Sequence, residues 1–400
     1  MTANFLAVKV RIITLVLVML GGIGTVVADA PTIDPADDAR YFGPIEDLYA
    51  WTPEQIVAGF RNMDKILPTR GIRTGETVLP LSLDLANLDD TVIRSRATTL
   101  TLDEYFKRQS VAGLLVIKDG EIAYERYGLG NSQDTRWVSF SVAKSVTSML
   151  VGAAVQDGYI ESVDEKVTDY LPRLRGSSYE DSSIRDLLQM SSGVQWNETY
   201  ADPSSDIASV NWETMALYEY LRDLPRNSTP GEAFNYNTAE TNLVGNLLRS
   251  AIGNNLATYL EEKIWKPFGM GEAANWVLTE PGGGEFGGSR ISATLRDFGR
   301  IGLFALGNGQ LADGTQVLPA SWMDESTSPS RGNAGYGYLW WLNPNGSYHA
   351  NGIFGQGIYI NPQENIVITL HSARPDASNG ADSALQDALY AALVDMLKGV

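Results

Sequence analysis

Two pairs of β-prone segments near opposite ends of the chain restrict its fold more than any other feature. Residues 111–128 hold two such segments on either side of Asp119-Gly120, a dipeptide that forms tight turns between antiparallel strands. Residues 357–370 hold a second pair with a proline in the turn, and a helical apolar pattern follows at 383–398. We therefore predict an antiparallel sheet that takes strands from both ends of the chain.

The long segment between these strand pairs is mostly helical in its apolar spacing. This pattern recurs through most of residues 145–320. A helical domain inserted into a sheet domain predicts an α+β fold, with an antiparallel sheet flanked by helices. The main domain is expected to cover residues 96–400, preceded by an N-terminal arm at 31–95 that packs on it. A cleft between the sheet and the inserted helices is the expected place for a small ligand.

The first thirty residues have the pattern of a signal peptide. Lys9 and Arg11 precede an uncharged stretch at 12–27, and small residues follow, with Ala28 and Ala30 as cleavage points. We expect an exported protein, periplasmic or extracellular. The alternative is an uncleaved membrane anchor, because the apolar stretch falls just short of the roughly 17 to 25 residues of a spanning helix.

Composition narrows the classes of partner and cofactor. The chain has 48 acidic and 30 basic residues, a net charge of −18, and no basic blocks, which argues against nucleic acid or an anionic membrane as partner. Cysteine is absent and the two histidines are His349 and His371, which leaves too few ligands for most zinc sites. We expect no metal, no cofactor and a small-molecule substrate. The sequence does not indicate an oligomeric state.

Ser141 and Lys144 stand three positions apart where an apolar helical run begins. At this spacing the two side chains share one helix face, and the unpaired N–H groups of a helix start favour negative charge. Partial burial would make a neutral lysine amine accessible, and that amine could take the proton of a serine nucleophile. The alternative is a capping serine beside a solvated lysine.

Two further motifs lie downstream of this pair. Tyr236 stands in a polar loop just before an apolar helix, where its hydroxyl could share a proton with a lysine amine; a half-buried tyrosine with a solvated hydroxyl is the alternative. Residues 349–362 combine glycines with β-prone side chains, which predicts a strand approached closely by another backbone or a ligand. A glycine-softened edge strand is the alternative there.

The order of these three motifs resembles that of the serine β-lactamase-like family, in particular its class C, esterase and 6-aminohexanoate-dimer hydrolase branch. Residues 187–206, 291–304 and 336–342 are similar to further stretches of that family. No serine stands in a G-x-S-x-G elbow, the pattern that an α/β-hydrolase would need.

The resemblance implies a set of site residues. Ser141 would be the acylated nucleophile, Lys144 its proton partner and Tyr236 the base or proton relay. The backbone N–H groups of Ser141 and Ile353 would form the oxyanion hole. The residues expected to line the substrate pocket are Trp196, Tyr200, Trp340 and Gly352.

Two departures from the β-lactamase pattern affect the expected substrate. Thr238 stands two positions after the tyrosine, where asparagine is usual, and Ala350-Asn351-Gly352 stands where Lys-Thr-Gly or His-Thr-Gly is usual. Both replaced side chains help to hold a β-lactam, so we expect a serine hydrolase of esters or linear amides, a carboxylesterase or a 6-aminohexanoate-dimer-hydrolase-like amidase. The alternatives are a β-lactamase or D-Ala-D-Ala peptidase, or a penicillin-binding-like cell-wall protein without turnover.

Overall fold

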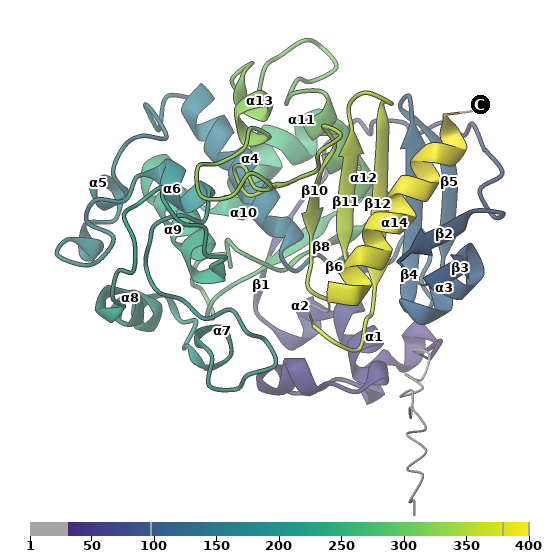
Figure 1. Cartoon of the computed structure of the whole chain (residues 1–400), viewed down its shortest axis with the longest axis horizontal. Coiled ribbons are helices and arrows are strands. Elements are labelled where there is room, and N and C mark those ends of the chain that lie inside the picture. The colour runs from purple at the N-terminus through teal and green to yellow at the C-terminus, as the bar shows by residue number, and fades with distance from the viewer. Residues whose placement is uncertain (1–30, 97, 378–379, 399–400) are drawn as a thin grey trace, which may run out of the picture.

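The computed structural model describes residues 31–96, 98–377 and 380–398, so the predicted signal peptide at 1–30 lies outside the described residues. Within those ranges, no helix is both long and apolar enough to cross a membrane. Figure 1 shows a sheet with helices on its faces beside a mostly helical part, and the N-terminal arm lies along the lower edge of both.

A six-stranded antiparallel sheet lies at the centre of the main domain, as predicted, and it combines strands from both ends of the chain. The turn before its edge strand has Asp119 at φ 52° and Gly120 at φ 86°, the left-handed conformation that this dipeptide adopts readily. The strands, in sheet order, are β5 (Glu121–Tyr127), β4 (Val111–Lys118), β12 (Ile366–Ser372), β11 (Gly357–Asn361), β10 (Tyr348–Asn351) and β9 (Trp341–Leu342).

The glycine-bearing stretch at 349–362 was expected to be one strand, and that prediction was wrong. It is a hairpin in which β10 pairs with β11, and Gly355 at φ 91° makes the connection. The expected close approach of another backbone is present at Gly352, where an added Cβ would lie 2.6 Å from the Ser139 carbonyl oxygen. The turn therefore sits against the residues that lead into Ser141.

Helices cover both faces of this sheet. On one face α14 (Gly380–Leu397) and α3 (Leu102–Arg108) bury leucines and tyrosines against β4 and β12. On the other face α12 (Leu295–Leu306) lies close because Gly302 has no side chain; an added Cβ would lie 2.4 Å from Val367. The α+β class with a helix-flanked antiparallel sheet is thereby confirmed.

The expected helical insertion at 145–320 is mostly helical, but it also holds strands β7 and β8, and its last helix, α12, belongs to the sheet layer. These strands join β1 and β6 in a second sheet of order β1-β7-β8-β6. Its strands are β1 (Thr69–Ile72), β6 (Arg136–Val138), β7 (Ala274–Val277) and β8 (Ile291–Thr294).

The longest helices of the remaining part are the buried helix α4 (Val142–Gln156) and α9 (Thr238–Ile252). The others are α5 (Val167–Tyr170), η3 (Pro172–Leu174), α6 (Ile184–Leu188), α7 (Asp206–Ser209), α8 (Thr214–Asp223), α10 (Leu256–Leu260), η4 (Glu261–Trp265), α11 (Lys266–Phe268) and α13 (Trp322–Ser326). Helices α4 and α9 pack against each other, and both begin next to the site described below.

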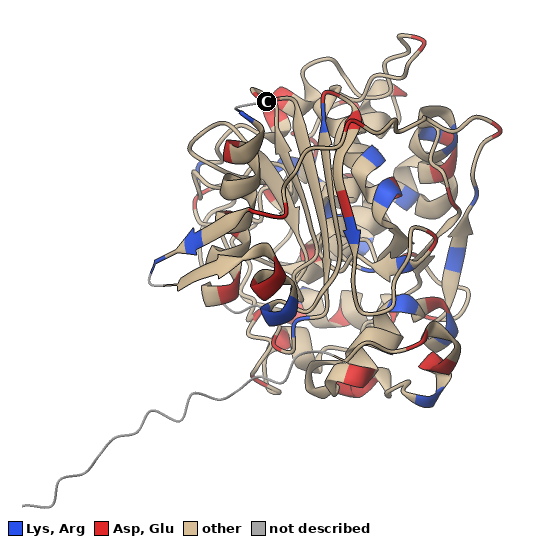
Figure 2. Ribbon diagram, turned by 90° about the vertical axis from the view of Figure 1, so that its right-hand side faces the viewer, with Lys and Arg blue, Asp and Glu red and all other residues tan. Residues whose placement is uncertain are grey.

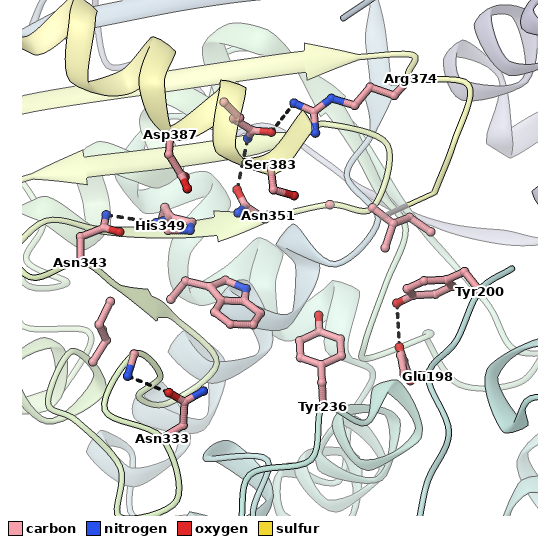
Figure 3. Close-up of a pocket in the computed structure, with 16 residues that line it drawn as sticks. Glu198, Tyr200, Tyr236, Asn333, Asn343, His349, Asn351, Arg374, Ser383 and Asp387 are labelled. Carbon is pink, nitrogen blue, oxygen red and sulfur yellow. Dashed lines mark hydrogen bonds between the residues drawn. The ribbon is translucent and has the colours of Figure 1, made fainter. Parts of the chain in front are cut away.

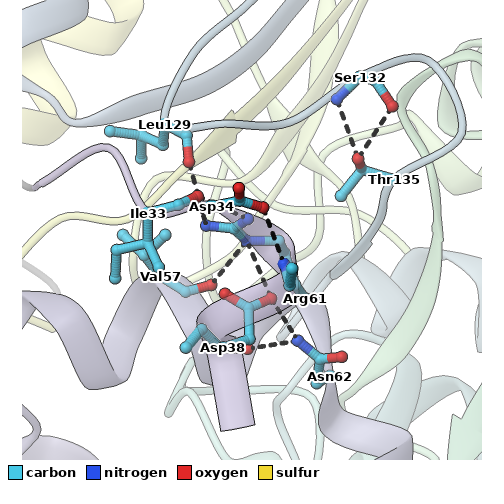
Figure 4. A network of polar contacts seen from close by, with 11 residues as sticks. Ile33, Asp34, Asp38, Val57, Arg61, Asn62, Leu129, Ser132 and Thr135 are labelled. Carbon is cyan, nitrogen blue, oxygen red and sulfur yellow. Dashed lines mark hydrogen bonds and ion pairs between the residues drawn. The ribbon is translucent and has the colours of Figure 1, made fainter. Parts of the chain in front are cut away.

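The N-terminal arm is tied to the main domain by a buried polar network (Figure 4). Arg61 donates hydrogen bonds to the carbonyl oxygens of Ile33 (3.1 Å) and Leu129 (3.0 Å) and lies 3.6 Å from the Asp38 carboxylate. Asn62 donates to the same carboxylate at 2.8 Å. The arm thus joins the body through the bond from Arg61 to the Leu129 carbonyl as well as through strand β1.

The other elements of the arm and of the segment after it are short. They are η1 (Pro35–Arg40), η2 (Ile45–Ala50), α1 (Pro53–Arg61), α2 (Met63–Ile66), β2 (Val92–Ser95) and β3 (Thr98–Thr101), the last two forming a pair beside α14. Figure 2 shows acidic and basic residues interspersed over helices and loops, with the sheet strands mostly of other residues.

Candidate active site

Ser141 lies at the N-terminus of α4, but its side chain does not cap the helix. It occupies the N-cap position with φ −68° and ψ −7°, and its hydroxyl accepts no capping hydrogen bond. The residue before it, Phe140, has φ 44°, a backbone conformation that is uncommon for a bulky residue and often marks functional sites. The hydroxyl is therefore free for another role.

Lys144 is buried with an exposed fraction of 1%, so the alternative of a solvated lysine is wrong. Its Nζ donates to the Ser141 hydroxyl at 3.0 Å, to the Thr238 hydroxyl at 3.0 Å and to the Gly288 carbonyl at 2.8 Å. Burial lowers the pKa of Lys144 to about 7, although the nearby Glu198 charge favours the ammonium. Near neutral pH a large fraction of this amine can accept a proton.

Tyr236 lies on the other side of Lys144, whose Nζ is 5.1 Å from the centroid of the tyrosine ring. The ring stacks on Trp341 at 5.8 Å and 16°, which fixes its orientation. Burial raises the pKa of Tyr236 far above its usual value, the charge of Glu198 raises it further, and the Ser141 hydroxyl opposes both. This tyrosine keeps its proton near neutral pH and can donate it.

A carboxylate that the sequence did not single out organises the polar side of the site. Glu198 accepts hydrogen bonds from the Thr238 backbone N–H at 3.1 Å, from the Tyr200 hydroxyl at 2.7 Å, and from the Thr238 hydroxyl and the Trp196 indole. Because the Thr238 hydroxyl gives its proton to Glu198, its lone pair is available to Lys144. Threonine can thus take the place of the usual asparagine.

Glycine at position 288 allows this arrangement. The Gly288 carbonyl accepts from Lys144, and a Cβ added at this residue would lie 2.8 Å from the Thr238 carbonyl oxygen. The backbone at Gly288 therefore passes very close to the backbone at Thr238. This approach brings the Gly288 carbonyl and the Thr238 hydroxyl to Lys144.

Two backbone amides are candidates for the oxyanion hole that the resemblance implies. Ser141 is the N-cap residue of α4, and Ile353 directly follows Gly352, which packs on Ser139. Within the described part of the chain, neither N–H has a protein acceptor. Such donors are worth about 3 kcal/mol each when they meet a developing oxyanion.

A cleft of about 610 Å³ opens beside these groups (Figure 3). Tyr200 and Gly352, both expected in the pocket, line it. Trp340 does not: it is fully buried and packs edge-on against Tyr348 at 5.2 Å. Its neighbour Trp341 lines the cleft instead, because successive residues of an extended segment point to opposite sides.

Trp196 was also expected in the pocket wall, and the structure places it behind the wall. It is 5% exposed, and its indole N–H donates to Glu198. Glu198 itself lines the cleft, so Trp196 supports a site residue without lining the cavity. A lone acid between two aromatic residues of a polar loop was the signal that could have identified Glu198.

Neither histidine is arranged as a metal ligand. Burial lowers the pKa of His349 to about 4 and that of His371 to about 3, so both are neutral. Among the described residues, no three histidine, cysteine, aspartate or glutamate side chains come together in a way that could hold a metal ion.

Comparison with known proteins extends the resemblance seen in the sequence. The 6-aminohexanoate-dimer hydrolase of Paenarthrobacter ureafaciens is 28% identical over 369 residues, which is 84% of this chain and 91% of that protein. A beta-lactamase of Yersinia enterocolitica is 25% identical over 179 residues, covering 42% of this chain and 43% of its own length.

Solved structures show the same fold. A Bacillus anthracis protein provisionally described as a 6-aminohexanoate-dimer hydrolase superposes with a TM-score of 0.78 at 23% identity, covering 86% of this chain and 95% of its own. A class C beta-lactamase from Rhodobacter sphaeroides gives 0.58 at 16% identity, covering 74% and 97%. The family model described as Beta-lactamase matches residues 101–392, which hold Ser141, Lys144 and Tyr236. The chain is therefore a member of the beta-lactamase family.

Proposed function

We propose that this protein is a serine hydrolase that cleaves esters or linear amides through an acyl-enzyme on Ser141. One observation carries the proposal above the others: the Ser141 hydroxyl does not cap its helix and lies 3.0 Å from a buried amine whose pKa burial lowers to about 7. A serine is a weak nucleophile until a neighbouring base removes its proton, and Lys144 provides that base.

In the acylation step, the neutral Lys144 amine takes the Ser141 proton while the serine oxygen forms a bond to the substrate carbonyl carbon. The carbonyl oxygen becomes an oxyanion that accepts from the N–H groups of Ser141 and Ile353. The tetrahedral intermediate then expels its leaving oxygen or nitrogen, which receives a proton from Tyr236. Tyr236 recovers a proton from the Lys144 ammonium, so the acyl-enzyme forms with both groups in their starting states.

Deacylation repeats these steps with water. Water attacks the acyl carbon while its proton passes to Lys144, directly or through Tyr236, and the returning proton restores the Ser141 hydroxyl as the ester bond breaks. The difference between the two pKa values supports this division of roles. Lys144 exchanges a proton near neutral pH, whereas Tyr236 stays protonated until a leaving group or water needs its proton.

The cleft supports an extended substrate over a β-lactam. Ala350 is 1% exposed and offers no charged or hydrogen-bonding side chain where β-lactamases carry lysine or histidine. The Asn351 Oδ1 atom already accepts from Gln386 at 3.2 Å. The 610 Å³ cleft with Trp341 and Leu342 in its wall suits a linear chain. The relative from P. ureafaciens, named for a linear amide, points the same way.

A substrate panel tests the proposal directly. With purified protein we expect steady turnover of 4-nitrophenyl butyrate, or of the 6-aminohexanoate dimer, with a kcat/KM at least about 100-fold above that for nitrocefin. About 3 kcal/mol of missing contact to the β-lactam carboxylate would produce this difference. Measured initial rates decide it.

The same panel separates the alternatives. Nitrocefin turnover equal to that of the best ester would establish a β-lactamase and contradict the proposed substrate class. A single stoichiometric burst with every substrate would instead indicate a penicillin-binding-like protein that is acylated without turnover.

Export is proposed on the features of the first thirty residues: two basic residues, an uncharged stretch and small residues at Ala28 and Ala30. We expect the mature chain to begin just after one of these alanines. N-terminal sequencing and intact mass of protein recovered from outside the cytoplasm would check this. An intact Met1 on membrane-bound protein would favour the anchor.

A further inference from the structure

A second, smaller cavity also reaches the nucleophile. It has a volume of about 20 Å³ and is lined by Ser141 and by Leu48 and Tyr49 of the N-terminal arm. Tyr200 and Ile353 line both this cavity and the 610 Å³ cleft. The small cavity, which has Ser141 in its wall, therefore adjoins the large cleft.

Arg290 lines the small cavity. In the described part of the chain it forms no ion pair and donates no side-chain hydrogen bond, and its Nε is buried without an acceptor. Its Cζ lies 5.1 Å from the Phe286 ring. Glu198 of the adjoining cleft is already engaged by Thr238 and Tyr200. A buried donor without a protein acceptor is costly, so an acceptor that enters this pocket would gain from pairing with it.

The backbone holds this arginine beside the nucleophile. The Arg290 N–H donates to the Phe140 carbonyl at 3.2 Å, and the Arg290 carbonyl accepts from Val277 at 3.1 Å. Both Arg290, at φ 67°, and Phe140, at φ 44°, are in the left-handed region. A long side chain at such a position, where glycine would be easier, is a sign that the side chain serves a purpose.

The free guanidinium, the small cavity and the nearness of Ser141 define a subsite. Resting on the proposed function, we propose that Arg290 pairs with a carboxylate of the substrate, so that esters or amides bearing a free carboxylate are preferred. A guanidinium offers parallel donors that match a carboxylate. The space of about 20 Å³ is small, which excludes bulky anions. A net charge of −18 repels anionic substrates, and a local cation offsets that repulsion.

Two matched substrate pairs test the subsite. 4-Butyryloxybenzoate and its methyl ester place the free or capped carboxylate on the leaving group, and monophenyl adipate and phenyl methyl adipate place it on the acyl chain. The enzymes are wild type, Arg290→Met and Arg290→Lys. The control with the same charge change is Arg108→Met, at an exposed position of α3. Comparing each substrate between enzymes cancels its intrinsic reactivity.

We expect Arg290→Met to lower kcat/KM by about 10- to 100-fold for the carboxylate member of at least one pair, the range for a lost hydrogen bond to a charged group. The capped member should change less than about threefold. Arg290→Lys should recover part of the loss, and Arg108→Met should match wild type. Equal losses for free and capped members of both pairs, or no loss, would overturn the subsite.

A binding measurement keeps this test independent of turnover. On a Ser141→Ala background, calorimetry should show that Arg290→Met weakens binding of the preferred carboxylate ligand about 10-fold or more, while the capped ligand is unaffected. If wild type hydrolyses none of the four compounds, the proposed function fails, and the calorimetric comparison still decides the subsite. Equal binding of the free ligand with and without Arg290 would refute it.

Discussion

Replacing Ser141 with alanine is expected to lower kcat on the best ester by on the order of 10⁴ to 10⁶, because no covalent intermediate can form without the hydroxyl. A fluorophosphonate should add one label to the wild-type peptide that contains Ser141, and none to the variant. Progress curves and peptide mass spectrometry measure the two effects.

Ser148→Ala is the matched control for this change. Ser148 lies on the same buried helix, and its hydroxyl has no hydrogen-bond partner among the described residues, so removing it should leave both activity and labelling near wild type. A label on another serine in wild type, or substantial turnover by Ser141→Ala, would remove Ser141 from the role of nucleophile.

The second large effect concerns Lys144 and Tyr236, which we propose manage one proton network. Lys144→Met, which keeps most of the side-chain volume, and Tyr236→Phe should each lower kcat by on the order of 10² to 10⁴. Because both act on the same proton, the double variant should be little worse than the poorer single variant. Steady-state kinetics on all four enzymes gives the coupling.

The pH dependence of kcat/KM tests the same proton network independently. Below about pH 7 Lys144 is protonated and cannot accept the serine proton, so wild-type kcat/KM should rise with pH and level off above about 7. Lys144→Met should lose this limb. Tyr336→Phe, a buried tyrosine 6.4 Å from the Tyr236 ring, serves as control and should retain it. If the losses of kcat in the Lys144→Met and Tyr236→Phe variants multiplied fully in the double variant, the two residues would act separately.

The sequence predicted the sheet well because its signals are local. Asp119-Gly120 determines a turn, and alternating apolar runs on each side determine the strands that meet there. The hairpin at 349–362 was missed because a glycine-rich run of β-prone residues is compatible with one strand or two. The second sheet was missed because its strands have only three or four residues each and come from the arm, the body and the insertion.

The candidate site was predictable where a motif keeps its members close in sequence. Ser141 and Lys144 share one helix turn, so their spacing alone places them together. Glu198 reaches the same point from another loop, and Trp341 replaced Trp340 because burial depends on which face of a short strand is covered. Contacts of that kind depend on packing between distant segments, which no local pattern encodes.

The N-terminal arm is a structural part of the hydrolase although it lies outside the residues that the family model matches. The family match begins at residue 101, yet β1 of the arm completes the sheet edge at β7, and Tyr49 of the arm forms a wall beside the nucleophile. Exchange of modules between relatives at that boundary would separate a catalytic unit from one of its own walls. We therefore expect a chimaera that joins this body to another arm at residue 101 to lose activity.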